Sequence, residues 1–379
     1  MAFTTSVVGS FPRPKPLIEA FQKFERGEVD KDDLEAHLRD AIVDTIRGQE
    51  SAGVDVITDG EQRRSSFVAF VGQKVPGFRL VHVTQLNPRA REIMEREKAQ
   101  LTLWRAVAVD PIRPVPLAAD ELAFTKRVTD RPVKVTLPSP YLLMWETWHA
   151  ERSKACYPRP EDLASDCVQL IREEIRRLGS AGAAFVQLDE PMLGDLVEAG
   201  EHEPDRYRKV AEQIYGQRYR GFRNELSLAR DLVNETVEGI GGVRIGMHLD
   251  RWPNPDSPHY GAGYERLLPD VLDVKVRQYV LEYASPGSGD PVKFAEHLPG
   301  DREIGLGVIE VRNRAVEEPS AIVARVQRIL RHVDPERIWL NPDCGFAPGM
   351  HRTFPRSVAF DKLRSMVTAA NRLRELHGA

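Results

Sequence analysis

Short apolar runs alternate with longer amphipathic stretches along the whole chain. Eight of these runs have the length and composition of buried strands: residues 4–11, 54–61, 133–138, 183–190, 243–250, 277–283, 303–310 and 338–344. Strands separated by helices pair in parallel through right-handed crossovers, and eight such units close into a (β/α)8 barrel. We therefore predict an α/β protein with a single TIM-barrel domain over residues 1–379, in preference to an open doubly wound sheet.

The amphipathic stretches have a helical period. Residues 31–51 place an apolar side chain at every fourth position, and residues 160–179 repeat this pattern, as helices packed on a barrel require. Both stretches end in Ser-Ala-Gly, a helix stop that leads into the next strand. Residues 85–130 and 200–241 are longer than a crossover needs. We predict excursions in the second βα connection and before the fifth strand, with a charged helix over 89–100 in the first of them.

Composition narrows the class of partner. The chain has 53 basic and 57 acidic residues and a net charge of -4, so no overall field attracts nucleic acid or an anionic membrane. No apolar run is long enough to span a bilayer, and the first residues lack the features of a signal peptide. Three cysteines form a sparse, odd set that fits a reducing compartment. We expect a cytoplasmic enzyme with a small-molecule substrate; the oligomeric state stays open.

Polar side chains gather where the predicted strands end. They are Ser10, Glu61, Ser139, Asp189, Glu190, His248, Asp250, Glu282, Glu310, Asp343 and Cys344. In TIM barrels the carboxyl ends of the strands carry the active site, whereas apolar side chains fill the interior layers. An acid-rich rim with one histidine and one cysteine predicts a metal site at the barrel mouth.

Four of these residues form a mixed donor set. His248 and Asp250 lie two apart on one strand, so both point to the same face. Glu282 ends the next strand, and Cys344 ends the eighth. Singly, a rim histidine or a lone cysteine is more often a packing residue; it is the set of four that indicates a metal. Nitrogen, oxygen and thiolate donors together suit zinc and disfavour magnesium or calcium.

Five short motifs and one glutamate, in this order, resemble one known family. They are V-G-S-F-P at 8–12, D-G-E at 59–61, Q-L-D-E-P at 187–191, G-M-H at 246–248, Glu282, and N-P-D-C-G at 341–345. Over nearly its whole length the chain resembles the catalytic C-terminal barrel of cobalamin-independent methionine synthases. In that family zinc held by histidine, glutamate and two cysteines binds the thiol of homocysteine, which attacks a folate methyl group. The resemblance implies His248, Glu282 and Cys344 as three zinc ligands.

The same resemblance implies a substrate site and one departure. Ser10, Glu61 and Asp189 would hold the amino-acid part of the thiol substrate, the two carboxylates meeting its ammonium group. The family has H-x-C where this chain has Asp250. A carboxylate keeps the charge of a thiolate but is a harder donor, so bound zinc would be a stronger Lewis acid and a bound thiolate a weaker nucleophile. An altered reaction or an easier electrophile is therefore an open alternative.

The alkyl donor also stays open. Full-length relatives carry a second barrel that helps to bind a folate, whereas this chain has room for one barrel. Single-barrel relatives include core methionine synthases and epoxyalkane:coenzyme M transferases. We predict that zinc activates a small thiol, and that Glu190 or Asp343 protonates the leaving group. The aromatic run 141–148 is either core packing or a wall for a pterin.

Three other interpretations remain. An oxygen-rich zinc site with an open position also suits a hydrolase or lyase. A binding protein with a decayed site is a non-enzymatic alternative. The chain also resembles uroporphyrinogen decarboxylase in its predicted shape, where arginines bind substrate carboxylates without a metal; Arg13, Arg63 and Arg64 lie near strand ends for this role.

Overall fold

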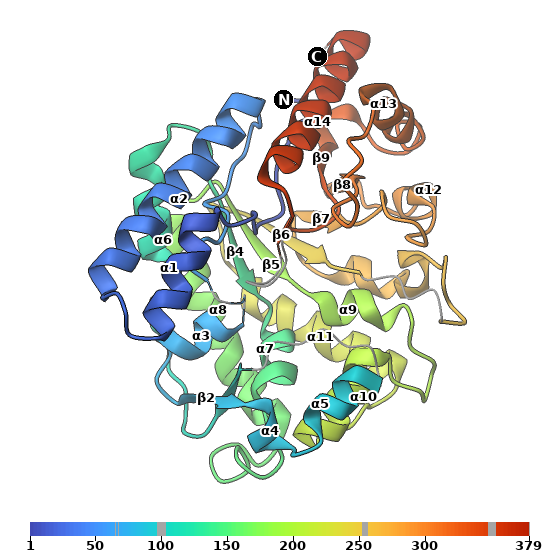
Figure 1. Cartoon of the computed structure of the whole chain (residues 1–379). Helices are drawn as coiled ribbons and strands as arrows, with labels where there is room; N and C mark the ends of the chain where they lie inside the picture. Colours follow the sequence, from blue (N-terminus) through green and yellow to red (C-terminus); the bar gives the residue numbers. More distant parts are fainter. Residues whose placement is uncertain (65, 67, 97–103, 252–256, 348–353, 379) are drawn as a thin grey trace.

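Seven parallel strands form one curled sheet at the centre of the molecule (Figure 1). The computed structural model describes residues 1–64, 66, 68–96, 104–251, 257–347 and 354–378, and the sheet order is β1-β9-β8-β7-β6-β5-β4. The strands are β1 (Thr4–Thr5), β4 (Lys134–Pro138), β5 (Phe185–Asp189), β6 (Arg244–Leu249), β7 (Gln278–Leu281), β8 (Glu303–Ile309) and β9 (Ile338–Pro342). Each of them lies within a run predicted to be a strand.

The eighth place in the barrel is filled by a short segment around Val56. Ser6, directly after β1, makes a parallel bridge to Val56, and Ile57 makes one to Val133, directly before β4. These bridges join the two edges of the seven-stranded sheet, so the ring closes into the predicted TIM barrel. The prediction of a regular strand over 54–61 was wrong, because only two residues of that run pair with their neighbours.

Helices cover the outside of the barrel (Figure 1). They include α2 (Lys31–Ala52), α6 (Ala119–Val128), α8 (Pro160–Ser180), α11 (Phe222–Val237), α12 (Pro291–Ala295), α13 (Pro319–Gln327) and α14 (Arg356–His377). The apolar stripe of α2 is buried, as its period predicted. Gly53 and Gly182 follow α2 and α8 with φ values of 86° and 82°. This left-handed conformation is the helix stop predicted from the two Ser-Ala-Gly sequences.

The connection that leads to β4 holds a small layer of its own. It contains α3 (Ala69–Lys74), β2 (Phe78–His82), α4 (Val83–Leu86), α5 (Ala90–Arg96) and β3 (Trp104–Ala108). The helix predicted over 89–100 corresponds to α5, and residues 97–100 lie outside the described part of the chain. The antiparallel pairing of β2 with β3 was not predicted.

The second predicted excursion packs against this layer. It follows α9 (Pro191–Leu196) and contains α10 (Arg206–Tyr215) and α11. Figure 1 shows α5 and α10 side by side, and the side chain of Asn87 donates to the carbonyl of Gln213 at 2.8 Å. The two excursions therefore form one structure on one side of the barrel.

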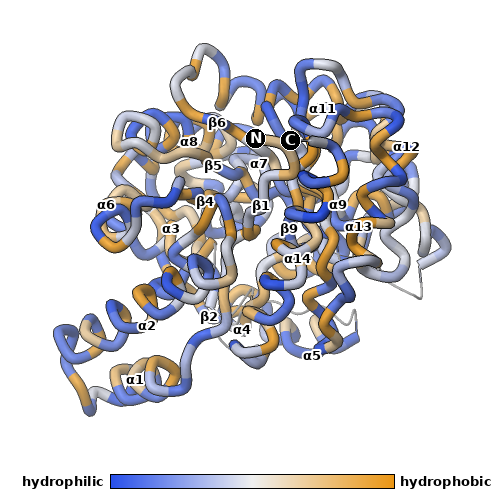
Figure 2. The backbone as a smooth tube through the Cα atoms, turned by 90° about the horizontal axis from the view of Figure 1, so that it is seen from above, coloured by the Kyte–Doolittle hydropathy of each residue, from blue (hydrophilic) through white to orange (hydrophobic). Residues whose placement is uncertain are grey.

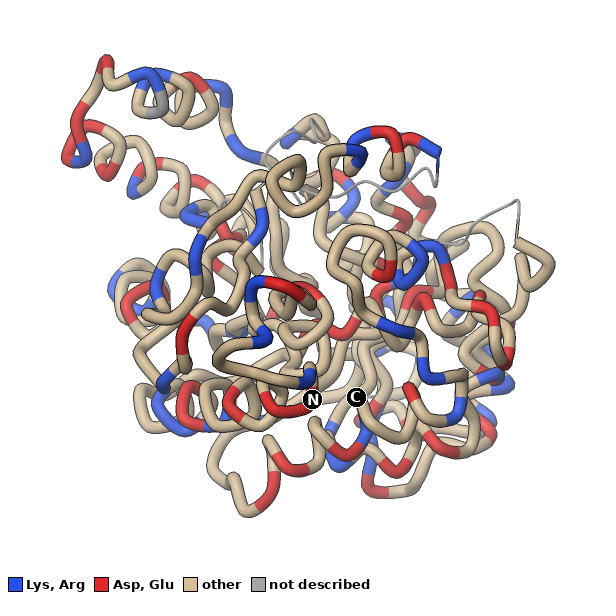
Figure 3. Tube along the Cα trace, turned by 90° about the horizontal axis from the view of Figure 1, so that it is seen from below, with Lys and Arg blue, Asp and Glu red and all other residues tan. Residues whose placement is uncertain are grey.

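A helical hairpin projects from the body of the protein. Figure 2 shows α1 (Lys15–Glu25) and the first half of α2 reaching out from the body, held together by a small apolar cluster. Figure 3 shows basic and acidic residues interspersed along the trace, in keeping with the small net charge. None of the described helices has the length and apolar character needed to cross a membrane.

The interior of the barrel is more polar than we predicted. Five apolar residues form a cluster there: Val8, Val56, Phe185, Val280 and Trp339. Lys134, Gln187 and Gln278 share the interior faces of their strands with this cluster and are at most 2% exposed. The expectation of purely apolar layers was therefore wrong. A buried polar group needs a partner inside the protein: Lys134 donates to Gln187, and Gln278 donates to Glu303 at the amino end of β8.

Candidate metal centre and active site

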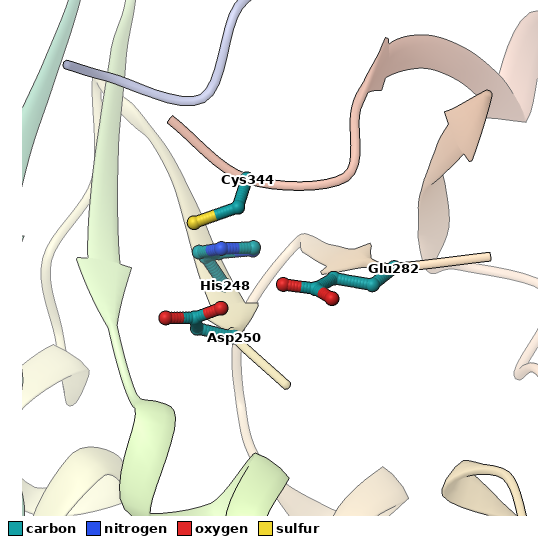
Figure 4. Close-up of side chains that lie close together, drawn as sticks. All are labelled: His248, Asp250, Glu282 and Cys344. Carbon is teal, nitrogen blue, oxygen red and sulfur yellow. The ribbon is translucent and has the colours of Figure 1, made fainter. Parts of the chain in front are cut away.

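Four side chains converge at the barrel mouth (Figure 4). His248 lies on β6, with Asp250 directly after that strand, while Glu282 follows β7 and Cys344 follows β9. Each residue offers one donor atom, and these four atoms lie within 4.8 Å of one another. His248, Glu282 and Cys344 are buried, whereas Asp250 is partly exposed. This is the set of four residues singled out from the sequence.

The donor atoms are prepared to accept a cation. The Nδ1 atom of His248 lies 3.1 Å from the carbonyl oxygen of Val280 and donates to it, because a carbonyl only accepts. The tautomer thus leaves a lone pair on Nε2, which is buried and has no hydrogen-bond partner among the described residues. The Oδ1 atom of Asp250 is buried without a partner in the same way. Orphaned acceptors are costly, and a metal ion would satisfy both.

An arginine that sequence reasoning missed holds one of the four residues. The Nη2 atom of Arg312, in the loop after β8, donates to both carboxylate oxygens of Glu282, at 2.8 and 3.1 Å. The backbone N–H of Arg251 donates to the same carboxylate at 3.1 Å. Nothing in the local sequence distinguishes Arg312 from other loop arginines. Its position beside Glu282 depends on the neighbouring strands of the closed barrel.

The charges explain why the cluster needs a cation. Burial raises the pKa of the Cys344 thiol well above its usual range, and the negative charges of Asp250 and Glu282 raise it further. Burial and then Asp250 also raise the pKa of Glu282, against the opposing effect of Arg312. Burial acts to raise the pKa of Asp250 too, but its hydrogen bond with Glu282 and the charges of His248 and Arg312 outweigh this and lower it. Acids packed this closely hold protons unless a metal replaces them.

The predicted substrate residues lie beside this cluster. Asp189 on β5 is paired in register with His248 on β6. Burial raises the pKa of Asp189 well above its usual range, and Glu61 and Asp250 add to the effect. A Cβ atom added at Gly345 would lie 2.1 Å from the hydroxyl oxygen of Ser10, so Ser10 packs against the residue that follows Cys344. The fold thus brings the two predicted sets of residues to one place.

Glu61 adopts an unusual backbone conformation. Its φ value is 54°, in the left-handed region that costs a residue other than glycine about 1–3 kcal/mol. Its N–H donates to Asp59 at 2.8 Å, and the side chain of Arg13 donates to its carbonyl oxygen at 3.0 Å. The hydroxyl of Thr136 donates to its Oε1 atom at 2.7 Å. These contacts hold the Glu61 carboxylate at the mouth, and strain held in this way is common at functional sites.

The two predicted acids differ in their surroundings. Glu190 is buried, caps α9 through the N–H of Leu193 at 3.3 Å and bonds to the hydroxyl of Ser139. Burial raises its pKa to about 7. Asp343 accepts four hydrogen bonds from residues 283–285, at 2.6 to 2.9 Å. Both oxygens of Asp343 therefore hold the loop that directly follows Glu282.

The three arginines considered for a metal-free decarboxylase are engaged within the protein. Arg64 pairs with Glu121 at 2.7 Å, and Arg63 pairs with Glu35. Arg13 donates to two backbone carbonyls. Their side chains thus have internal partners that a substrate carboxylate would have to displace.

The other aromatic and cysteine candidates belong to the core. The aromatic run forms α7 (Pro140–Thr147), in which Tyr141 and Trp145 are at most 1% exposed. Cys167 lies on the buried face of α8 and is fully buried, as its place on the apolar stripe predicted. Cys156 is half-buried and donates to the carbonyl of Ser153 at 3.2 Å. Among the described cysteines, only Cys344 belongs to the candidate metal cluster.

A TIM barrel with a candidate mixed-donor metal cluster and a second acidic group at its mouth has the arrangement of the class of TIM-barrel enzymes, which carry the active site at the carboxyl ends of the strands. Within that class, the profile described as cobalamin-independent synthase, catalytic domain, matches residues 3–215 and 261–372. The chain belongs to this family and is a methyltransferase of its kind. Residues 216–260, which contain His248 and Asp250, lie outside the match.

Individual relatives cover nearly the whole chain. It is 31% identical over 376 residues to the methionine synthase of Sulfurisphaera tokodaii, covering 98% of this chain and 92% of that protein. It is 29% identical to the methionine synthase of Pyrococcus furiosus, with coverage of 98% and 93%. The solved B12-independent methionine synthase of Shewanella sp. W3-18-1 shares the fold, with a TM-score of 0.75, 18% identity and coverage of 100% of both chains.

Proposed function

We propose that this protein transfers a methyl group to the thiol of homocysteine, or of a closely related amino-acid thiol, with a zinc ion at the barrel mouth. The named activity of its relatives supports this reaction. The observation that carries the metal requirement is the convergence of four donor atoms within 4.8 Å, two of them buried without partners. A thiolate among the four favours zinc over magnesium or calcium.

In this proposal His248, Asp250, Glu282 and Cys344 hold the metal. Zinc held there would supply Lewis acidity that lowers the pKa of a substrate thiol, so that a thiolate would be available at neutral pH. The protein contributes the geometry around that position. Val280 fixes the tautomer of His248, and Arg312 fixes the carboxylate of Glu282. Asp250, where the family has cysteine, makes the donor set harder than that of typical relatives.

The amino-acid part of the substrate lies on the other side of the mouth. Glu61, which is buried, and Asp189, whose pKa is raised by burial and by the charge of Glu61, supply two carboxylates for its ammonium group and make such a counter-charge favourable. Ser10, packed beside Gly345, offers a hydroxyl for the substrate carboxylate. Recognition of both polar groups sets the thiol toward Cys344 and His248, which supplies the orientation that methyl transfer needs.

We assign protonation of the leaving group to Glu190 or Asp343. Of these two, Glu190 has the pKa suited to a proton donor near neutral pH, about 7. Asp343 has both oxygens occupied by loop donors, so its contribution to the reaction would be to position Glu282. The methyl donor itself stays open between a methyl-folate and another carrier, because the described residues include no group that selects one of them.

Metal analysis of the purified protein is the decisive experiment. We expect about one zinc ion per chain, and its loss in Cys344→Ser and Asp250→Ala. Cys156→Ser, which changes a half-buried cysteine outside the cluster, is the matched control and should retain the metal. Zinc lost in Cys344→Ser but kept in Asp250→Ala would mean a three-ligand site. Protein purified without chelator and still free of metal would refute the zinc centre.

A thiol panel then tests the reaction. The loaded enzyme is given homocysteine with methyl-folate, methylcobalamin or a small epoxide, and the alkylated thiol is measured. Methionine formed from homocysteine supports the proposal. A metal-loaded protein that alkylates homocysteine with none of these donors, and whose metal coordination does not change when homocysteine is added, would instead support the hydrolase or lyase alternative.

A further inference from the structure

Lys134 is a buried amine that the proposed reaction does not use. It lies on β4 inside the barrel, 2% exposed, with its Nζ atom 4.7 Å from the centre of the Phe185 ring. Its two hydrogen bonds go to neutral acceptors, the carbonyl oxygen of Val7 at 2.8 Å and the Oε1 atom of Gln187 at 3.1 Å. Burying an amine without an adjacent carboxylate lowers the stability of the fold, so we expect Lys134 to have a function.

The hydrogen bonds of Lys134 lead to the barrel mouth. Lys134 donates to the Oε1 atom of Gln187, and the two acceptors on the other side of that amide require its NH2 group, so the amide turns its oxygen toward Lys134. That NH2 group donates to Asp189 Oδ1 at 2.7 Å and to the carbonyl of Val8 at 3.1 Å. The arrangement uses both hydrogens of the amide and leaves Asp189 Oδ2 without a hydrogen bond among the described residues.

We propose that Lys134 is a positioning residue that acts through Gln187 to aim the free carboxylate oxygen of Asp189 at the ammonium group of the substrate. This inference rests on the proposed function, in which Asp189 meets that ammonium group. Without Lys134, the oxygen of the Gln187 amide loses its only donor among the described residues, and the amide is held only by the bonds that its NH2 group donates to Asp189 and Val8. The orientation of Asp189 is then fixed less firmly, and its carboxylate loses the nearby positive charge that favours its ionised form.

Electrostatics agree with this geometry. Burial lowers the pKa of Lys134 to about 7, and Asp189 is the charge that opposes this shift. If Lys134 served only to fill space, its replacement by methionine would raise the free energy of unfolding, because methionine fills similar space and carries no charge. Lys134→Met is therefore expected to leave the free energy of unfolding unchanged or higher while it impairs substrate recognition. If Lys134 instead served only to hold the fold together, Lys134→Met would lower the free energy of unfolding and leave substrate recognition intact.

The experiment compares two thiols on the zinc-loaded enzyme. Homocysteine carries the ammonium group, and 4-mercaptobutanoic acid has the same length without it. The readout is the ratio of their KM values, with kcat measured for each. We expect Lys134→Met to raise KM for homocysteine about 10-fold, the effect of one charge-assisted hydrogen bond, and to leave KM and kcat for 4-mercaptobutanoic acid unchanged.

Two further variants control the test. Gln187→Leu removes the link itself and should give the same loss, and the double variant should lose no more than either single one, because the two residues act in series. Lys362→Met changes a buried lysine on α14, paired with Glu317, and should leave the KM ratio as in the native enzyme.

The outcomes separate the inference from the function on which it rests. A native enzyme that prefers homocysteine and a Lys134→Met variant that keeps the same preference would overturn the role of Lys134 alone. A native enzyme that alkylates both thiols with equal KM would overturn the ammonium contact of Asp189, and the inference with it. Additive losses in the double variant would also refute a serial link between Lys134 and Gln187.

Discussion

The buried ion pair between Arg64 and Glu121 offers a test that separates stability from substrate binding. The side chains are 3% and 4% exposed, and Arg64 donates to Glu121 Oε2 at 2.7 and 3.0 Å. Its remaining nitrogen donates to the carbonyl and hydroxyl oxygens of Thr136, at 2.9 and 2.8 Å. Since that hydroxyl accepts from Arg64, its single proton is directed to Glu61.

Glu121→Gln keeps the shape of the side chain and removes its charge. Arg64 would then be a buried cation without the carboxylate that it bonds directly, and the loss of such a partner typically costs about 3–5 kcal/mol of unfolding free energy. The neighbouring pair of Arg63 and Glu35 is the matched control. Its side chains are 21% and 28% exposed, so Glu35→Gln should cost only about 0–1 kcal/mol. Urea unfolding of both variants, with midpoint and slope compared, measures the difference.

The double variant Arg64→Met, Glu121→Leu completes the test. Removing both charges should recover most of the lost stability, because no unpaired ion is left. It also removes the donor that orients Thr136, so KM for homocysteine should rise while stability is near normal. A cost below about 1 kcal/mol for Glu121→Gln would refute the burial argument. Normal KM in the stable double variant would refute the link from Arg64 to Glu61.

Three further predictions concern the mouth of the barrel and its surroundings. Arg312→Met should weaken zinc binding about 10–100-fold in a chelator competition, because the carboxylate of Glu282 loses the donor that orients it; unchanged or tighter binding would contradict this. Burial, with Glu121, raises the pKa of Asp59 to about 6 from 3.8, so the folded state takes up a proton between these values and loses stability as pH rises through them. Asp59→Asn should therefore add about 1–3 kcal/mol at pH 7 and little below pH 4, as measured by urea unfolding across pH. Gly345→Ala would place a Cβ atom 2.1 Å from Ser10 Oγ and 3.2 Å from its backbone nitrogen, so KM should rise with zinc content intact, whereas Gly300→Ala, with open space around it, should have no effect.

The sequence predicted the order of strands and helices in the barrel because the patterns that indicate these elements are local. The four-residue period of α2, the Ser-Ala-Gly stops and the apolar strand runs each depend on consecutive residues. The failed prediction of a regular strand at 54–61 has the same origin, since composition shows that a run is apolar but not that only Val56 and Ile57 pair with neighbours. The β2–β3 hairpin was missed because its strands are partly polar and far apart in the chain.

For the candidate site, too, the sequence could identify some features and not others. His248, Asp250, Glu282 and Cys344 could be proposed from the sequence because each ends a predicted strand, and the strand ends of a barrel meet. Their roles as zinc ligands, like those of Ser10, Glu61 and Asp189 in substrate binding, remain predictions for the experiments above. The sequence also identified the departure at Asp250, since an H-x-D pair needs no coordinates to be recognised.

Only the tertiary structure decided which side chains support that site. Lys134 lies 127 residues from Val7, whose carbonyl it binds, and Arg312 lies 30 residues from Glu282. No local sequence pattern indicates such partners. Which side chains meet depends on distances across the closed barrel, and each buried charge needs an opposite charge or a hydrogen-bond partner. The sequence by itself determined the strands, the helices and the chemical groups at the mouth; the closed barrel decided which charges neutralise and orient them.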